Sequence, residues 1–263
     1  MTSPSNETDQ TRAIEVEVEV PGTPEEVWEA IATGPGITAW FVPTELEERE
    51  GGGVRLDFGP LGTDEAVVTG WEPPHRFAAR GTEGVAQEVL VEARSGGTCV
   101  VRLINSGFSS EWEDQLDGVA DGWRKHLHEL RMYLTHFAGQ RVSSIQVMGS
   151  RAGTPEDALG ALTRTLGIGE LAPGGRMTAS VADGPTLDGT ADVVDADTIL
   201  FRSDEPAPGY GMLAATRFGD RTLTVVRLYL FGDDAPAVAA REQRAWQGWM
   251  DERFPFAQPA QKA

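Results

Sequence analysis

The sequence contains one helix-start motif twice, and this repetition constrains the fold more than any other feature. Residues 22–26 read GTPEE, and residues 153–157, 131 positions later, read GTPED. In each copy a threonine can cap a helix, a proline takes the first helical position, and an acidic residue completes a capping box. A chain of 263 residues is long enough for two domains of ordinary size. Two copies are too few for a solenoid, so the repeat predicts a tandem pair of domains.

The segments around the first motif predict an antiparallel sheet followed by a long helix. Residues 13–20 alternate strictly between apolar and glutamate side chains, which is typical of a strand with one dry face and one acidic face. An amphipathic helix is predicted from about Glu111 to Ala138, with a capping box at Ser110 and Glu113. Turn signals between these segments separate further predicted strands near 44–50, 53–59, 64–71, 75–81, 85–94 and 97–106.

The second motif opens a similar series of elements. A terminal helix is predicted from about Ala235 to Arg253. Strands are predicted before it near 176–182, 187–194, 198–203, 210–218 and 221–231. We therefore predict a domain at 13–139, a shorter and divergent copy at 140–255, a disordered tail at 1–12 and a further tail at 256–263.

Composition narrows the classes of function. The chain has 41 acidic and 22 basic side chains and a formal net charge of -19, which argues against binding to nucleic acid or to anionic membranes. Its apolar runs are shorter than a membrane span, its first residues are polar, and Cys99 is its single cysteine. Arginine replaces lysine at nearly every basic position, which favours a GC-rich bacterial genome. These features predict a cytoplasmic bacterial protein.

Motifs for metals, cofactors and nucleophilic catalysis are missing from the sequence. Four histidines and one cysteine lack the spacing of a metal site. The sequence also lacks a nucleophile elbow, a phosphate-binding loop and a dinucleotide fingerprint. We therefore expect no metal and no cofactor, and no catalytic residue can be assigned.

Several motifs in the first half resemble one known family. The segments TPEEVWEAIATGPGITAWFVP, GGGVRLDF, VVTGWEPPHRFAAR and DGWRKHLHELRMYL are similar to the SRPBCC (START/Bet v 1-like) superfamily, and most similar to its heat-shock-protein-90 ATPase activator-like branch. The resemblance covers about 13–138 and is weaker over 141–253. It implies an α+β helix-grip fold, in which a seven-stranded antiparallel sheet curls around a long carboxy-terminal helix and two short helices close one end.

A curved sheet and a straight helix leave space between them, and such concave apolar spaces bind small ligands. We predict a cavity of this kind in the first domain. The candidate lining residues are Trp40, Phe41, Phe58, Trp112, Trp123, His126, Leu130, Tyr133 and Arg102. Ordinary packing of the aromatic side chains is the alternative interpretation.

Three polar residues, Gln87, Arg102 and Asn105, interrupt otherwise apolar predicted strands. A polar side chain on the concave face would need a partner or a ligand, whereas one on the opposite face would meet solvent. A shift of one residue in register reverses the answer.

Three functions remain open at this point. The first is non-catalytic binding of a hydrophobic or aromatic small molecule. The second is a cyclase or dehydratase of polyketide-like metabolism that uses His126, Tyr133 or Arg102. The third is a co-regulator of a chaperone ATPase. A homodimer is a further candidate assembly.

Overall fold

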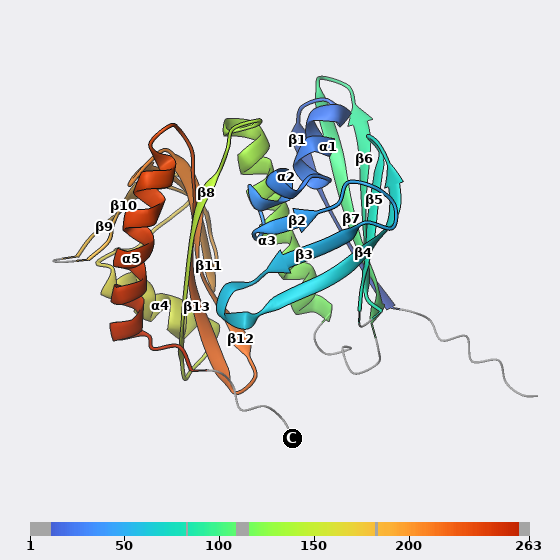
Figure 1. Cartoon of the computed structure of the whole chain (residues 1–263). Coiled ribbons are helices and arrows are strands. Elements are labelled where there is room, and N and C mark those ends of the chain that lie inside the picture. The colour runs from blue at the N-terminus through green and yellow to red at the C-terminus, as the bar shows by residue number, and fades with distance from the viewer. Residues whose placement is uncertain (1–11, 83, 109–115, 182–183, 258–263) are drawn as a thin grey trace, which may run out of the picture. The chain divides into compact units, whose positions relative to one another are not determined.

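The computed structural model describes residues 12–82, 84–108, 116–181 and 184–257 (Figure 1). The chain divides into two compact units, Met1–Ala138 and Gly139–Ala263. The division lies one residue before the predicted end of the first domain at 139. Each unit contains an antiparallel sheet and a long helix near its carboxyl end, so the chain consists of tandem helix-grip domains.

Within its described residues, the first unit has a seven-stranded sheet and three helices. Its helices are α1 (Pro24–Ile31), α2 (Gly34–Thr38) and α3 (Leu116–His136), with a short 3-10 turn at Gly59–Leu61. Its strands are β1 (Arg12–Pro21), β2 (Thr44–Leu46), β3 (Gly53–Asp57), β4 (Thr63–Glu72), β5 (Arg76–Gly81), β6 (Ala86–Arg94) and β7 (Thr98–Phe108). The strand order is β1-β7-β6-β5-β4-β3-β2, so the first strand pairs with the last.

The pairing of β1 with β7 fixes which side of the sheet faces the interior. Val16 lies opposite Leu103 and Val18 opposite Val101, and α3 contacts β1. The alternation predicted for 13–20 is confirmed: Val16 is buried, whereas Glu15 and Glu17 are exposed. The dry face of β1 and the apolar stripe of α3 thus belong to one core.

The second unit repeats this plan with one strand fewer. Its strand order is β8-β13-β12-β11-β10-β9, so here too the first strand pairs with the last. The strands are β8 (Ser143–Arg151), β9 (Arg176–Ser180), β10 (Thr186–Val194), β11 (Thr198–Glu205), β12 (Gly209–Phe218) and β13 (Arg221–Leu230). The helices are α4 (Pro155–Thr165) and α5 (Ala235–Arg253), and α5 lies beside β8 (Figure 1).

The two repeated motifs adopt the same local structure. The backbone N–H of Glu26 donates to Thr23 Oγ1 at 3.3 Å, and that of Asp157 donates to Thr154 Oγ1 at 3.1 Å. In each box the acidic side chain accepts from the backbone N–H of its threonine. The preceding residue in each copy is a glycine with a φ of 117° or 114°, a region that favours glycine. Both helix starts are therefore determined locally.

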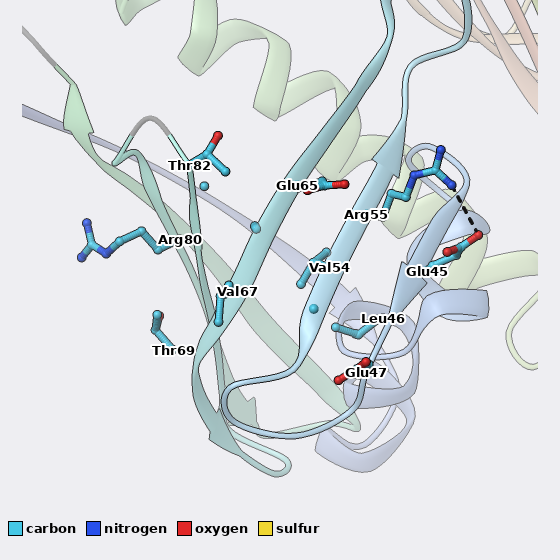
Figure 2. A pocket seen from close by; sticks show the side chains of 13 residues that line it. Glu45, Leu46, Glu47, Val54, Arg55, Glu65, Val67, Thr69, Arg80 and Thr82 are labelled. Atoms are coloured by element: carbon cyan, nitrogen blue, oxygen red, sulfur yellow. Dashed lines mark ion pairs between the residues drawn. The ribbon is translucent and has the colours of Figure 1, made fainter.

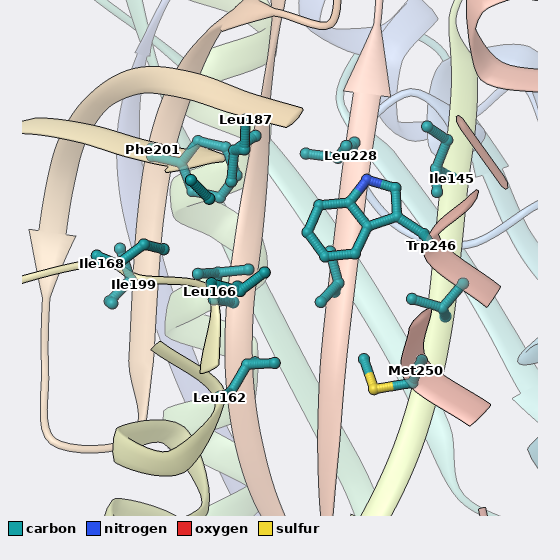
Figure 3. Packing of buried hydrophobic residues seen from close by; sticks show 14 of the residues in the cluster. Ile145, Leu162, Leu166, Ile168, Leu187, Ile199, Phe201, Leu228, Trp246 and Met250 are labelled. Atoms are coloured by element: carbon teal, nitrogen blue, oxygen red, sulfur yellow. The ribbon is translucent and has the colours of Figure 1, made fainter. Parts of the chain in front are cut away.

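The interior of the second unit is filled by its own side chains. Figure 3 shows the fully buried ring of Trp246 among apolar residues of β8, β13 and α5, including Ile145, Leu228 and Met250. Phe201 and Leu166 are also completely buried in this cluster. Large apolar side chains of the described residues thus pack into one buried cluster in this unit.

Each of the two predicted tails includes residues that belong to a folded unit. Arg12 already belongs to β1, where it lies opposite Phe108. Ala257 donates from its backbone N–H to Ser150 Oγ at 3.0 Å, and Ser150 donates to the carbonyl of Phe254 at 3.3 Å. The segment after α5 therefore runs beside β8 instead of leaving the domain at 256. The sequence does not show this because the contacts join residues about one hundred positions apart.

One predicted strand is also too long. The strand expected at 44–50 ends at Leu46, because the chain then turns: Gly52 donates to the carbonyl of Arg49 at 3.0 Å. At Gly52 any larger residue would place its Cβ 2.2 Å from the carbonyl oxygen of Glu47. The predicted capping box of Ser110 and Glu113 lies outside the described residues.

The capping boxes predict matched losses of stability. Thr23→Ala and Thr154→Ala each remove a side-chain acceptor from a helix start, so each should lower the free energy of unfolding by about 1 kcal/mol. Urea denaturation followed by circular dichroism measures this. Thr23→Ser and Thr154→Ser keep the hydroxyl group and should retain most of the stability. Equal losses in the serine and alanine variants would contradict the capping role.

Asp157 predicts a pH dependence in the second unit. Its hydrogen bonds with Thr154 hold the pKa of the Asp157 carboxyl group below its ordinary value. The ionised carboxylate therefore stabilises the fold above the unfolded pKa of about 3.9, and this contribution is lost as pH falls through the lower folded value. The stability difference between wild type and Asp157→Asn should be present at neutral pH and shrink below about pH 4.

Urea denaturation at several pH values measures this difference. Glu156→Gln is the matched control, because it removes one charge from the same helical turn but leaves the capping box in place. A difference for Asp157→Asn that does not change with pH would contradict the role of the ionised carboxylate.

Candidate functional site

A cavity of about 410 Å³ lies inside the first unit. Every strand from β3 to β7 contributes to its wall, and α3 covers it with Val119 and Trp123. The segment from α1 to β2 closes one end with Ile31, Ile37 and the Trp40-Phe41 pair. The predicted hollow between sheet and helix is therefore present in this unit.

Phe41 joins the aromatic side chains at the closed end. Its ring centroid lies 5.2 Å from that of Trp123 and 5.9 Å from those of Phe58 and Trp40. The imidazole of His126 also lies against it, at 4.7 Å in an edge-to-face arrangement. These separations are typical of attractive aromatic pairs. The cluster brings together residues of three segments and forms an aromatic wall.

Trp40 has a fixed orientation in this wall. Its indole Nε1 donates to the carbonyl of Ala30 at 2.9 Å, and the side chain is almost completely buried. The short helix before it begins at a cap, where Gly36 donates to Thr33 Oγ1 at 3.0 Å. Local capping thus positions α2, and α2 in turn positions the tryptophan over the cavity.

Two neighbouring amide side chains lie on the cavity wall. Gln87 of β6 and Asn105 of β7 are direct cross-strand partners. Their row continues to Ala79 on β5 and to Ile14 on β1, so apolar residues flank the amide pair. Asn105 is only 7% exposed, and no described residue donates a hydrogen bond to its Oδ1. Burial of an acceptor without a partner costs about 1–3 kcal/mol.

The charged groups of the cavity are all acidic. Asp64 and Glu65 lie on the lining and are exposed, which places them at the mouth. Lysine, arginine and histidine are absent from the described lining. The site therefore offers an uncharged interior and a negative entrance.

His126 lies next to the cavity without lining it. Its Nδ1 is 2.7 Å from Oε2 of Glu129, a carboxylate that is completely buried. This contact fixes the imidazole beside Phe41 and Trp123 and directs one ring nitrogen along α3. His126 therefore packs against the rings of Phe41 and Trp123 without lining the cavity.

The structure brings together four of the predicted lining residues. Trp40, Phe41, Phe58 and Trp123 all line the cavity. Leu130 and Tyr133 are buried on α3 but do not line it. Trp112 lies outside the described residues.

The expectation for Arg102 is wrong. On β7 its neighbours Val101 and Leu103 face the interior, so the arginine points to the opposite face of the sheet. There its Nε lies 3.1 Å from Glu15 and its Nη2 lies 3.4 Å from Glu17. The wet face of β1 supplies these carboxylates, and Arg102 neutralises part of that acidic row.

Some lining residues were not anticipated from the sequence. Ile31, Leu56, Phe77 and Val119 line the cavity together with Ala79 and Val89. These residues come from two helices and three strands, so predicting that they share one cavity requires the register and packing of all five elements. Asn105 and Gln87 were singled out as polar interruptions, and only the observed register places both on the concave face.

A larger hollow of about 710 Å³ lies over β2 to β5 (Figure 2). It contains the cross-strand row of Glu45, Arg55 and Glu65, in which Arg55 and Glu45 form an ion pair at 3.8 Å. Val67 at its floor is 51% exposed. Exposed charge and an exposed floor are typical of a solvated sheet surface, so the smaller aromatic cavity is the better candidate site.

Cys99 does not provide a nucleophile. Its side chain is buried on β7, and Sγ donates to the carbonyl of Gly22 at 3.4 Å. Burial raises the pKa of the thiol, and Glu25 and Glu26 raise it further. A protonated, enclosed thiol is unreactive.

Nowhere in the described part of the chain do three or more histidine, cysteine or acidic side chains gather as they would around a metal ion. Across the described ranges, every helix is too short or too polar to span a lipid bilayer.

The first unit is thus a helix-grip domain with an internal aromatic cavity. Residues 21–135 match the family model described as "Activator of Hsp90 ATPase homolog 1-like protein". The match confirms the resemblance that the motifs predicted: the amino-terminal domain belongs to this branch of the SRPBCC superfamily. The model covers most of the first unit and stops before the second.

Several solved structures are similar to parts of the chain. CalU16 from Micromonospora echinospora is 25% identical over 47% of this chain and 74% of its own, with a TM-score of 0.41. The Aha1 dimer from Colwellia psychrerythraea is 18% identical over 49% and 99%, with a TM-score of 0.43. The di-domain ARO/CYC BexL from the BE-7585A biosynthetic pathway is 16% identical over 94% and 100%, with a TM-score of 0.45.

At these TM-scores the likenesses carry no weight for the function of this chain. A search of curated proteins found no match.

The position of Arg102 leads to a prediction about the two faces of the sheet. Arg102→Gln should lower the free energy of unfolding by only about 0–1 kcal/mol, because exposed ion pairs contribute little. It should leave the affinity for an uncharged aromatic probe such as 2-naphthol unchanged. Urea denaturation and titration of the probe's fluorescence measure both quantities. Glu17→Gln is the control from the same ion-pair cluster, and a loss of affinity in Arg102→Gln alone would contradict the assignment.

Proposed function

We propose that the amino-terminal domain binds a planar, mainly apolar small molecule in the cavity between its sheet and α3. The observation that supports this best is a space of about 410 Å³, open at one mouth, with an aromatic wall of Trp40, Phe41 and Trp123. Ligand pockets typically have volumes of about 300–1,000 Å³ and present a few polar groups on a mostly apolar lining. The cavity of this domain has both properties.

The second domain differs from the first at the positions that form the proposed site. It lacks a counterpart of the Trp40-Phe41 segment, and large side chains fill its interior. The two domains thus differ in the side chains that face their interiors, and we assign the ligand site to the first.

Binding fits the site better than catalysis of the cyclase type. A general acid or base must come within hydrogen-bonding reach of the reacting atoms. The titratable side chains on the described lining are Asp64 and Glu65, and both are exposed at the mouth. His126 is paired with Glu129 outside the lining. A reaction would have to proceed by shape and amide contacts alone.

The family match supports a second candidate, a partner of a heat-shock ATPase. A fold hosts many functions, so family membership alone does not choose between a partner protein and a ligand receptor. A pull-down of the cell's own heat-shock ATPase with the full chain separates the two, because the cavity function does not need that partner.

Filling the cavity should abolish binding without unfolding the domain. Ala79 lies on the wall beside Gln87, so Ala79→Phe places a ring in the empty space. We expect this variant to lose 2-naphthol binding and any ligand seen by native mass spectrometry of freshly purified protein. The thermal midpoint should stay close to that of wild type, because the added ring enters empty space rather than a packed core.

Val67→Phe is the matched control, since it adds the same ring on the exposed face of the neighbouring strand. It should bind the probe as wild type does. Unchanged binding in Ala79→Phe would overturn the proposed site.

A further inference from the structure

Asn105 is the most deeply placed polar side chain on the cavity wall. It is 7% exposed, whereas Asp64 and Glu65 of the same lining are exposed at the mouth. It lies in the interior row of β7, and the interior residues before it, Cys99, Val101 and Leu103, are completely buried and apolar or nearly so. A ligand in this cavity therefore meets one buried polar position on β7.

The Oδ1 atom of Asn105 has an unused capacity to accept a hydrogen bond. No described residue donates to it, although the large majority of buried polar atoms in folded proteins have a partner. A leucine or valine would fill the same strand position without this cost. Asn105 lines the cavity, and its Oδ1 is covered by the wall without a protein partner, so a rotation of the side-chain amide would present this acceptor to a donor on a ligand.

The charges of the site restrict which donor is suitable. The described lining contains two carboxylates and no basic side chain. A carboxylate or phosphate on the ligand would meet an unpaired oxygen at Asn105 and negative charge at the entrance. A hydroxyl or N–H group would instead meet an acceptor in the interior.

The aromatic wall restricts the body of the ligand. Phe41, Phe58 and Trp123 present ring faces and edges to one space, which favours a flat ring system over a flexible chain. From these observations we infer that the ligand is an uncharged hydroxylated aromatic molecule whose hydroxyl group donates a hydrogen bond to Oδ1 of Asn105. The inference rests on the proposed binding function and adds the chemistry of the ligand and the residue that selects it.

Three probes that share one naphthalene ring system test the inference on the full chain. 2-Naphthol carries a donor, 2-methoxynaphthalene lacks it, and 2-naphthoate carries a negative charge. Affinities follow from the fluorescence of each probe on titration with protein. We expect wild type to bind 2-naphthol and to bind 2-naphthoate more weakly. Tighter binding of 2-naphthoate would overturn the inferred preference for an uncharged ligand.

The variant Asn105→Leu removes the acceptor and keeps the bulk. The ratio of the affinities for 2-naphthol and 2-methoxynaphthalene should fall about tenfold relative to wild type, because one hydrogen bond to a buried acceptor is lost. Comparing this ratio between wild type and variant cancels the difference in hydrophobicity between the two probes, because both proteins bind the same pair. The thermal midpoint of the free variant should rise, since an unsatisfied buried group is gone. Asn105→Val, which suits a strand, is the second variant if the leucine variant does not fold.

Arg102→Gln is the control on the same strand, because Arg102 lies on the face of β7 that points away from the cavity. It should leave the ratio near the wild-type value. An unchanged ratio in both Asn105 variants, with all probes still bound, would overturn the role of Asn105 and leave the cavity function standing. Failure of wild type to bind any probe would overturn the proposed function itself and the inference with it.

Discussion

The pairing of the first strand with the last strand in each unit is the constraint on which the rest of the structure depends. In the first unit β1 joins β7 through a register that places Val16 beside Leu103, and this closes the sheet beside α3. A sheet held in this way against a straight helix has a fixed concave side. Whether that side becomes a core or a cavity then depends on the size of the side chains that point into it.

The two units show both outcomes of the same plan. In the second unit Trp246 and Phe201 fill the concave side. In the first unit the facing positions of β5 to β7 include Ala79, Gln87 and Asn105, which are small or polar. The aromatic side chains there line the space instead of filling it. On one plan of strands and helix, the first unit thus keeps a cavity of about 410 Å³, whereas buried apolar side chains form a close-packed cluster in the second.

The polar groups of the first unit separate into two sets by the face of the sheet. Arg102 joins the glutamates of β1 on the wet face, where its charge offsets part of an acidic surface. Asn105, three positions later, lies on the dry face with an acceptor that the described residues do not use. The amide of Asn105 is therefore better evidence for a ligand contact than the ion pairs of Arg102. A buried polar group without a partner lowers stability, whereas an exposed ion pair changes it little.

The sequence by itself determined the features that depend on neighbouring residues. The two capping boxes, the alternation of β1, the helix at 235–253 and the tandem order of elements follow from spacings of two to four residues, and the structure contains all of them. Trp40 and Phe41 could also be named from the sequence as candidate lining residues. Tertiary structure alone decided the face of Arg102 and Asn105, the early end of β2 and the return of the segment after α5 along β8. Each depends on register or on contacts between residues far apart in the chain, and a one-residue change of register exchanges the two faces of a strand.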